Sequence, residues 1–104
     1  MNEIDGLNYL PVGTIVKLKK GNMRVIIIGR IPLFEDSNDK ISFYDYIGAI
    51  MPMGFDLNHS IYFNKIDVDR IVYRGYVDEL EINFQGDLDK WLSSNNERLQ
   101  KRQI

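Results

Sequence analysis

The chain has 104 residues, of which 44% are hydrophobic, 12% aromatic and 27% charged, with a formal net charge of -2 at pH 7. This composition is typical of one folded domain and argues against wholesale disorder. No apolar run approaches the roughly 20 residues of a transmembrane helix, and the lack of cysteine excludes disulfides and thiolate sites. We expect a single cytoplasmic domain over residues 1–104, with 1–9 as a loose leader and 93–104 as a polar tail or helix extension.

The strongest local pattern is a β-hairpin in the first third of the chain. Apolar and polar residues mostly alternate over Thr14–Lys19, which indicates a half-buried strand. Lys20-Gly21-Asn22 has the composition of a turn, because glycine and asparagine tolerate positive φ. The return strand, Met23–Arg30, contains the β-branched run Val25–Ile28. Four such residues in succession predict a central strand with apolar cover on both faces.

Three further strands and one turn are predicted before the C-terminal region. Residues 34–40 are turn-rich and polar, and we expect a loop there. The later segments alternate in polarity and are bounded by proline, glycine or asparagine. The expected strands are Ile41–Met51, Ser60–Phe63 and Asp69–Tyr76, with a single helical turn capped by Asn64 and Asp67 before the last of them.

The period becomes helical from Asp78 onward. Leu80, Phe84, Leu88 and Trp91 recur at spacings of three and four, which predicts one apolar stripe along a helix that Gly86 either weakens or divides. The predicted fold is therefore α+β: a small twisted antiparallel sheet or partly open β-barrel of about five strands, capped by this C-terminal helix. We expect the stripe to lie over an open face or mouth of the sheet.

No residue pattern supports catalysis or metal binding. His59 is the one histidine, and no serine stands in a nucleophile-elbow context. Asp56 and His59 are too few for a metal site, and Asp67 and Asp69 are explained by capping and turn roles. The glycines lack the context of a phosphate-binding loop. We therefore expect a protein that is not an enzyme and that uses no cofactor and no metal.

Two surfaces are candidates for binding. Lys17, Lys19 and Arg24 in the hairpin could follow a nucleic-acid backbone, but the net negative charge favours a solubilising role for them. Several tyrosines lie near Met51 and Met53, a combination that suits either packing or a protein-binding surface. Trp91, late in the predicted helix, could also dock a partner.

Several motifs occur in a recognisable order. They are LPVGTIVKLKKG from Leu10 to Gly21, IIGR from Ile27 to Arg30, YDYIG from Tyr44 to Gly48, the pair Phe63-Asn64 and the pair Gly75-Tyr76. Together, over roughly residues 9 to 92, they resemble a bacterial family known as domain of unknown function 4176. Proteins of this kind are encoded in Gram-positive Firmicutes beside type VII secretion genes and their LXG-type toxins.

The resemblance implies a cellular setting and a class of role. It implies an accessory, adaptor or chaperone-like protein that binds an LXG-type effector or a secretion component. A small nucleic-acid-binding or regulatory barrel and an immunity protein for the toxin remain alternatives, and a homo-oligomer stays open. The residues expected at the protein-binding surface are Arg30, Tyr44, Asp45, Tyr46 and Tyr76, together with Trp91. Arg30 and Asp45 could instead pair with each other across adjacent strands.

Overall fold

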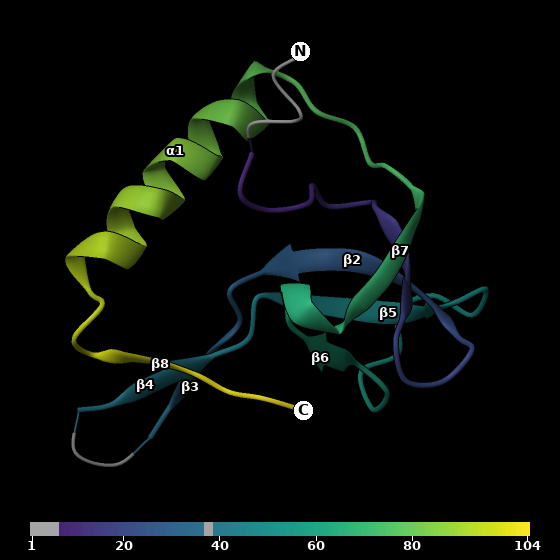
Figure 1. Cartoon of the computed structure of the whole chain (residues 1–104), viewed down its shortest axis with the longest axis horizontal. Coiled ribbons are helices and arrows are strands. Elements are labelled where there is room, and N and C mark those ends of the chain that lie inside the picture. Colours follow the sequence, from purple (N-terminus) through teal and green to yellow (C-terminus); the bar gives the residue numbers. More distant parts are fainter. Residues whose placement is uncertain (1–6, 37–38) are drawn as a thin grey trace.

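β2 (Arg24–Arg30) is the middle strand of a five-stranded antiparallel sheet, which confirms its predicted position. The computed structural model describes residues 7–36 and 39–104, and Figure 1 shows their arrangement. The strands run in the order β6-β5-β2-β1-β7, and the other bounds are Ile15–Leu18 (β1), Tyr46–Met51 (β5), Ile61–Phe63 (β6) and Val68–Tyr73 (β7). Among these residues the sheet is open, with β6 and β7 at its edges, and it does not close into a barrel.

The core lies against one face of this sheet. Val25 and Ile27 point into it, and Val16 of β1 pairs with Val25 on the same face. Tyr46 and Phe63, which are also paired, extend the core across β5 and β6. On the opposite face Ile26 and Ile28 are only half-buried. The sequence predicted apolar cover on both faces of β2, but only the core face is fully covered. The helix and the N-terminal segment both lie on that side of the sheet.

A second sheet of three short strands was not predicted. It has the order β3-β4-β8, and its strands are Leu33–Glu35 (β3), Ile41–Phe43 (β4) and Leu99–Lys101 (β8). β3 occupies part of the predicted loop 34–40, of which residues 37–38 lie outside the described residues. β8 lies in the predicted polar tail and pairs in parallel with β4. The expected loop was therefore wrong for β3, which pairs with β4 across a turn. The expected polar tail or helix extension was wrong for β8, whose partner β4 is distant in sequence.

The single strand predicted over Ile41–Met51 is two strands. β4 ends at Phe43 and β5 begins at Tyr46, and the two belong to different sheets. Between them the backbone N–H of Asp45 donates to Asn64 Oδ1 at 2.9 Å instead of joining a ladder. Asn64 begins the turn η2 (Lys65–Asp67), and its own N–H donates to Asp67 Oδ2 at 2.8 Å, as in the predicted capping box.

The helix α1 (Glu79–Ser94) is continuous through Gly86 and is capped by Asp78, whose side chain accepts a hydrogen bond from the Glu81 N–H. Its apolar stripe does not seal the sheet. Leu88 packs against the core, but Leu80 is 78% exposed and Phe84 and Trp91 are also exposed. In Figure 1, α1 connects the end of β7 to β8 and lies beyond the N-terminal segment rather than directly on the sheet. The stripe therefore covers the core through Leu88, with Leu92 beside it, and not through Leu80 and Phe84 as expected.

Replacing Gly86 with alanine is expected to stabilise the protein by about 1 kcal/mol, because glycine is the poorer helix former. An added Cβ at Gly86 meets no atom within 4 Å. Gly48→Ala is the opposing control, since its Cβ would lie 2.4 Å from Val25 Cγ1 and 2.9 Å from the Ile26 carbonyl oxygen. Urea unfolding measures both. A destabilised Gly86→Ala protein would show that α1 is not a regular helix at this position.

Candidate protein-binding surface

Arg30, at the end of β2, is joined to the first turns of α1 by a bidentate ion pair. Its Nη2 lies 2.8 Å from Glu81 Oε1, and its Nη1 donates to Glu81 Oε2 and to the Leu10 carbonyl oxygen. The two charged side chains are only 6% and 14% exposed. The guanidinium also lies 5.0 Å from the centroid of the Phe84 ring. This arrangement fixes one end of α1 to the sheet.

Gln85 continues the same polar network. It is buried, and its amide forms two hydrogen bonds with the backbone of Tyr9, to the N–H at 2.9 Å and to the carbonyl oxygen at 2.7 Å. Its Nε2 also donates to Glu81 Oε2 at 2.7 Å. Tyr9 is itself buried and packs edge-on against Tyr46. The loose leader was therefore wrong for Tyr9, while residues 1–6 lie outside the described residues.

Acidification is expected to weaken the attachment of α1. Burial alone would raise the pKa of Glu81, but hydrogen bonds from Arg30 and Gln85 bring it below its ordinary value of 4.5. The carboxylate therefore contributes its stability above pH 4.5 and loses it as the pH falls through the lower folded pKa. Urea unfolding between about pH 7 and pH 3 should show a smaller acid loss in Glu81→Gln. Identical acid losses would mean that this ion pair contributes nothing.

Asp45 is the centre of a second buried network. Its Oδ1 lies 3.0 Å from Lys101 Nζ, and its Oδ2 accepts a hydrogen bond from the Lys65 N–H at 2.8 Å. Asn64, which accepts from the Asp45 backbone, donates through Nδ2 to the Arg102 carbonyl oxygen at 2.7 Å. These contacts attach the C-terminal strand β8 to the junction between the two sheets.

Five of the six predicted surface residues divide into two groups, and the sixth, Tyr44, is half-buried. Arg30, Asp45 and Tyr46 are buried and serve the scaffold, so the expectation that they are exposed was wrong. Arg30 and Asp45 also do not pair with each other, because Arg30 pairs with Glu81 and Asp45 pairs with Lys101. Tyr76 is 79% exposed and Trp91 is also exposed, and these two remain available to a partner.

Two of the predicted tyrosines have defined packing roles. The Tyr46 hydroxyl accepts a hydrogen bond from the Leu10 N–H at 3.0 Å. Burial raises the pKa of Tyr46 to about 12, so the ring stays neutral. Tyr44 is half-buried and stacks on Tyr62 with the ring centroids 5.6 Å apart, and Phe34 meets both rings edge-on. This aromatic cluster joins the start of the second sheet to β6.

The edge strand β7 is the most accessible apolar part of the sheet. Its one strand partner among residues 7–36 and 39–104 is β1, so its other edge has no ladder there. Ile71, Val72 and Tyr73 are consecutive and exposed, Tyr73 at 61%. The sequence predicted a strand here, but the neighbour of a strand cannot be read from its own residues. The position at the edge is therefore a finding of the structure.

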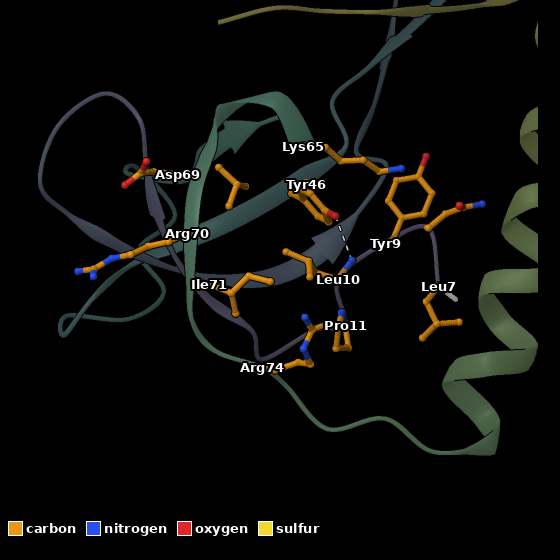
Figure 2. A pocket seen from close by; sticks show the side chains of 12 residues that line it. Leu7, Tyr9, Leu10, Pro11, Tyr46, Lys65, Asp69, Arg70, Ile71 and Arg74 are labelled. Carbon is orange, nitrogen blue, oxygen red and sulfur yellow. Dashed lines mark hydrogen bonds between the residues drawn. The ribbon is translucent and has the colours of Figure 1, made fainter. Parts of the chain in front are cut away.

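A pocket of about 420 Å³ opens beside this edge, as Figure 2 shows. One wall is the core-side face of β7, with Val68 and Ile71, and the other is the N-terminal segment, with Leu10 and Pro11. Tyr46 contributes the floor. The pocket continues the core outward to the free edge of the sheet, at a place that α1 does not cover.

Cations outnumber acids around this pocket. Lys65, Arg70 and Arg74 line it with one acid, Asp69, whose Oδ2 lies 3.6 Å from Lys17 Nζ. Lys65 Nζ lies 3.9 Å from the centroid of the Tyr9 ring. Burial lowers the pKa of Lys65, and Asp45 opposes that shift only in part. In Figure 2, Lys65 and Arg74 lie on opposite sides of the pocket, while Arg70 points outward from β7.

The histidine and its neighbour form an exposed surface pair. His59 Nδ1 lies 2.7 Å from Asp56 Oδ2 in the loop before β6. Hydrogen bonds from the Asn58 N–H and from His59 lower the pKa of Asp56. Within the part of the chain that the structure describes, histidine, aspartate and glutamate side chains nowhere gather in a group of three suited to a metal ion. The pair holds the turn between residues 56 and 59.

The comparison with family profiles decides the identity of the domain. A profile described as domain of unknown function (DUF4176) matches residues 9–84. The chain belongs to the DUF4176 family. No curated protein and no solved structure matches it. Within residues 7–36 and 39–104, none of the helices is long and apolar enough to cross a membrane.

The DUF4176 match extends over most of the features described above. It includes all five strands of the larger sheet, the β7 edge, and the Arg30–Glu81 ion pair. The second half of α1 and β8 lie beyond its end at residue 84. Sequence reasoning missed Glu81 and Gln85 as helix anchors, because both stand between apolar stripe positions and resemble ordinary solvent-facing residues. Lys65 and Arg74 gave no signal either, since the fold alone brings them to one pocket.

Proposed function

We propose that this DUF4176 protein is a non-enzymatic cytoplasmic accessory protein of a type VII secretion locus. It acts as an adaptor or chaperone-like protein that holds an LXG-type effector or a secretion component. The family resemblance is what supports this cellular setting. The observation that supports a binding role is the free edge of β7, with Ile71, Val72 and Tyr73 exposed beside an apolar pocket.

An exposed edge strand of this kind is a site for association. A row of unpaired backbone N–H and C=O groups can pair with another chain, and natural proteins commonly shorten or cover such edges. The other three edge strands, β6, β3 and β8, have three residues each, whereas β7 has six. β7 also exposes Ile71, Val72 and Tyr73, whereas the apolar residues of β6 at the opposite edge are half-buried or buried. A partner that covers β7 would remove this exposed surface from water.

The rest of the scaffold is arranged so that binding needs little reordering. α1 is fixed by the Arg30–Glu81 pair and by Gln85, whereas Leu80 on the same helix is 78% exposed. A preorganised surface loses less conformational entropy when it binds. Leu80, Phe84 and Trp91 on α1 are further exposed apolar side chains that a partner could cover.

Co-purification tests the proposal. The tagged protein is co-expressed with each product of its own gene neighbourhood, including the LXG protein, and recovery of one of them at near-equal amounts is expected. Tyr73→Glu should reduce this recovery at least tenfold, about 1.4 kcal/mol of binding free energy. Met53→Glu, which changes an exposed apolar residue away from β7, should leave the recovery intact. Failure to recover any product would contradict the proposal.

A toxicity assay separates this role from immunity. An adaptor is expected to bind the effector without protecting cells that express the toxin domain alone. Rescue of such cells by co-expression of the DUF4176 protein would contradict the adaptor role and indicate an immunity protein instead.

A further inference from the structure

We propose that the partner binds β7 by strand addition: an extended, acidic segment of the partner pairs with the free edge of β7 and places apolar side chains in the adjoining pocket. This inference rests on the proposed function and names the mode and chemistry of the same surface. It commits to a partner segment of alternating acidic and apolar residues as the occupant.

The length and position of β7 permit such pairing. A strand of six residues offers a ladder of about 20 Å. Its neighbour β1 occupies one side and is antiparallel, with Val16 opposite Ile71 and Leu18 opposite Val68. The register shifts between Ile15 and Val16 and again between Lys17 and Leu18. Within the described residues the other side has no strand. An added strand would therefore extend the sheet beyond β7 as its sixth strand.

The pocket lies where the side chains of an added strand would point. Val16 and Leu18 are buried in the core, so their partners Ile71 and Val68 mark the core-side face of β7. Alternate side chains of a neighbouring strand face the same side. They would enter the space of about 420 Å³ between β7 and the segment that carries Leu10. Its apolar walls select apolar residues at these positions, as in other peptide sites formed at sheet edges.

The charge around the pocket favours acidic residues at those positions of the added strand that do not enter the pocket. Lys65, Arg70 and Arg74 surround the site, and the one acid among the lining residues, Asp69, lies beside Lys17. A second copy of this chain paired through β7 would bring two such sets of cations together, which disfavours a homodimer at this edge. Acidic residues on the outward face and at the ends of the added strand would instead be attracted to them. The local positive charge is notable in a chain with a net charge of -2.

Fluorescence anisotropy with labelled synthetic peptides tests the inference. The probes are EVEIEVE and its charge-reversed counterpart KVKIKVK, followed by EVEIEVE variants with proline at each position in turn. The acidic peptide is expected to bind at least tenfold more tightly than the basic one. Proline should cause a loss of at least tenfold at alternate positions only, because every second N–H of an added strand faces its neighbour.

Charge variants of the protein locate the site. Arg70→Glu with Arg74→Glu should weaken EVEIEVE binding at least tenfold. The matched control is Lys20→Glu with Arg24→Glu, an equal charge change at exposed positions in the hairpin, which should alter it less than twofold. Circular dichroism establishes that both double variants are folded. If the β7 variant is unfolded, Arg74→Glu alone serves in its place.

Four results would overturn the inference: equal binding of the two peptides, no binding of either, a proline scan without alternation, or equal loss in both double variants. A fifth is rapid disulfide-linked dimerisation of Val72→Cys, since the parent chain has no cysteine and such a dimer would show that a second copy covers β7. These assays use no effector. Their failure beside successful co-purification would refute strand addition alone, whereas success without any recovered locus product would refute the proposed partner.

Discussion

Arg30→Ala is expected to lower the free energy of unfolding by about 3 kcal/mol, because it leaves the Glu81 carboxylate largely buried without its partner. The Arg30 side chain is 6% exposed and forms both hydrogen bonds of the ion pair. The loss also removes the contacts of the guanidinium with Leu10 and Phe84. For a domain of this size that is a large fraction of a stability of roughly 5–15 kcal/mol.

Urea unfolding and amide exchange measure this effect together. The amides of the first turns of α1 should exchange faster in Arg30→Ala, because the helix loses its attachment to β2. Arg24→Ala is the matched control, an exposed arginine at the other end of the same strand, and should change the stability by less than about 0.5 kcal/mol. Similar small effects of both substitutions would contradict the assigned role of Arg30.

A double substitution separates the charge pair from packing. Replacing Arg30 with methionine and Glu81 with leucine together removes both charges, and it should restore much of the lost stability, because buried ion pairs are often replaceable by apolar residues. The double variant should therefore be more stable than Arg30→Met alone. If it is less stable, the pair contributes a net attraction that apolar packing does not replace.

Asp45→Ala is expected to destabilise the protein by about 3 kcal/mol, because it removes a buried carboxylate that accepts charged and backbone hydrogen bonds. Lys101 loses its ion-pair partner, and the Lys65 N–H loses its acceptor. The C-terminal strand β8 should detach before the larger sheet unfolds, since Lys101 belongs to β8.

The matched control for Asp45 is Asp69→Ala. Asp69 also lies near a lysine, Lys17, at 3.6 Å, but it is far more exposed. Its removal should cost less than about 1 kcal/mol, as for other surface pairs. Urea unfolding compares the two, and exchange of the β8 amides reports on detachment. Equal losses, or an undisturbed β8 in Asp45→Ala, would show that the buried network does not hold this strand.

The parts of the fold that the sequence predicted are those set by local patterns. Val25–Ile28 is apolar on successive positions, and only a central strand buries such a run well. Asp78 precedes residues with a helical period, and α1 begins immediately after it. In both cases the residues of the element itself determine its type and its position, so no distant partner had to be known.

The parts that could not be predicted depend on distant partners. β3 and β8 have three residues each, too few for periodicity to show, and β8 exists through its pairing with β4 more than fifty residues earlier. The apolar stripe of α1 was recognised, but periodicity cannot tell whether a partner within the chain covers it. The contacts that orient α1 come from Gln85 and Tyr9, which are 76 positions apart.

The candidate surface was predicted less well than the fold for the same reason. The motifs predict that Asp45 and Tyr46 lie on the surface, but both are buried where the two sheets meet. The position of β7 at the edge depends on the order of the strands in the sheet. The pocket forms between β7 and the N-terminal segment, which is distant from β7 in the sequence. Neither is encoded in a single stretch of sequence.

Amide hydrogen exchange, measured on the free protein and on its complex with whichever product of the gene neighbourhood co-purifies with it, tests the proposed role of β7 most directly. Slower exchange in the complex over residues 68–74, with β6 at the opposite edge of the sheet unchanged, is the result expected for a partner strand paired with β7. Protection confined to β6 or to the loop before it, with β7 exchanging as in the free protein, would contradict it.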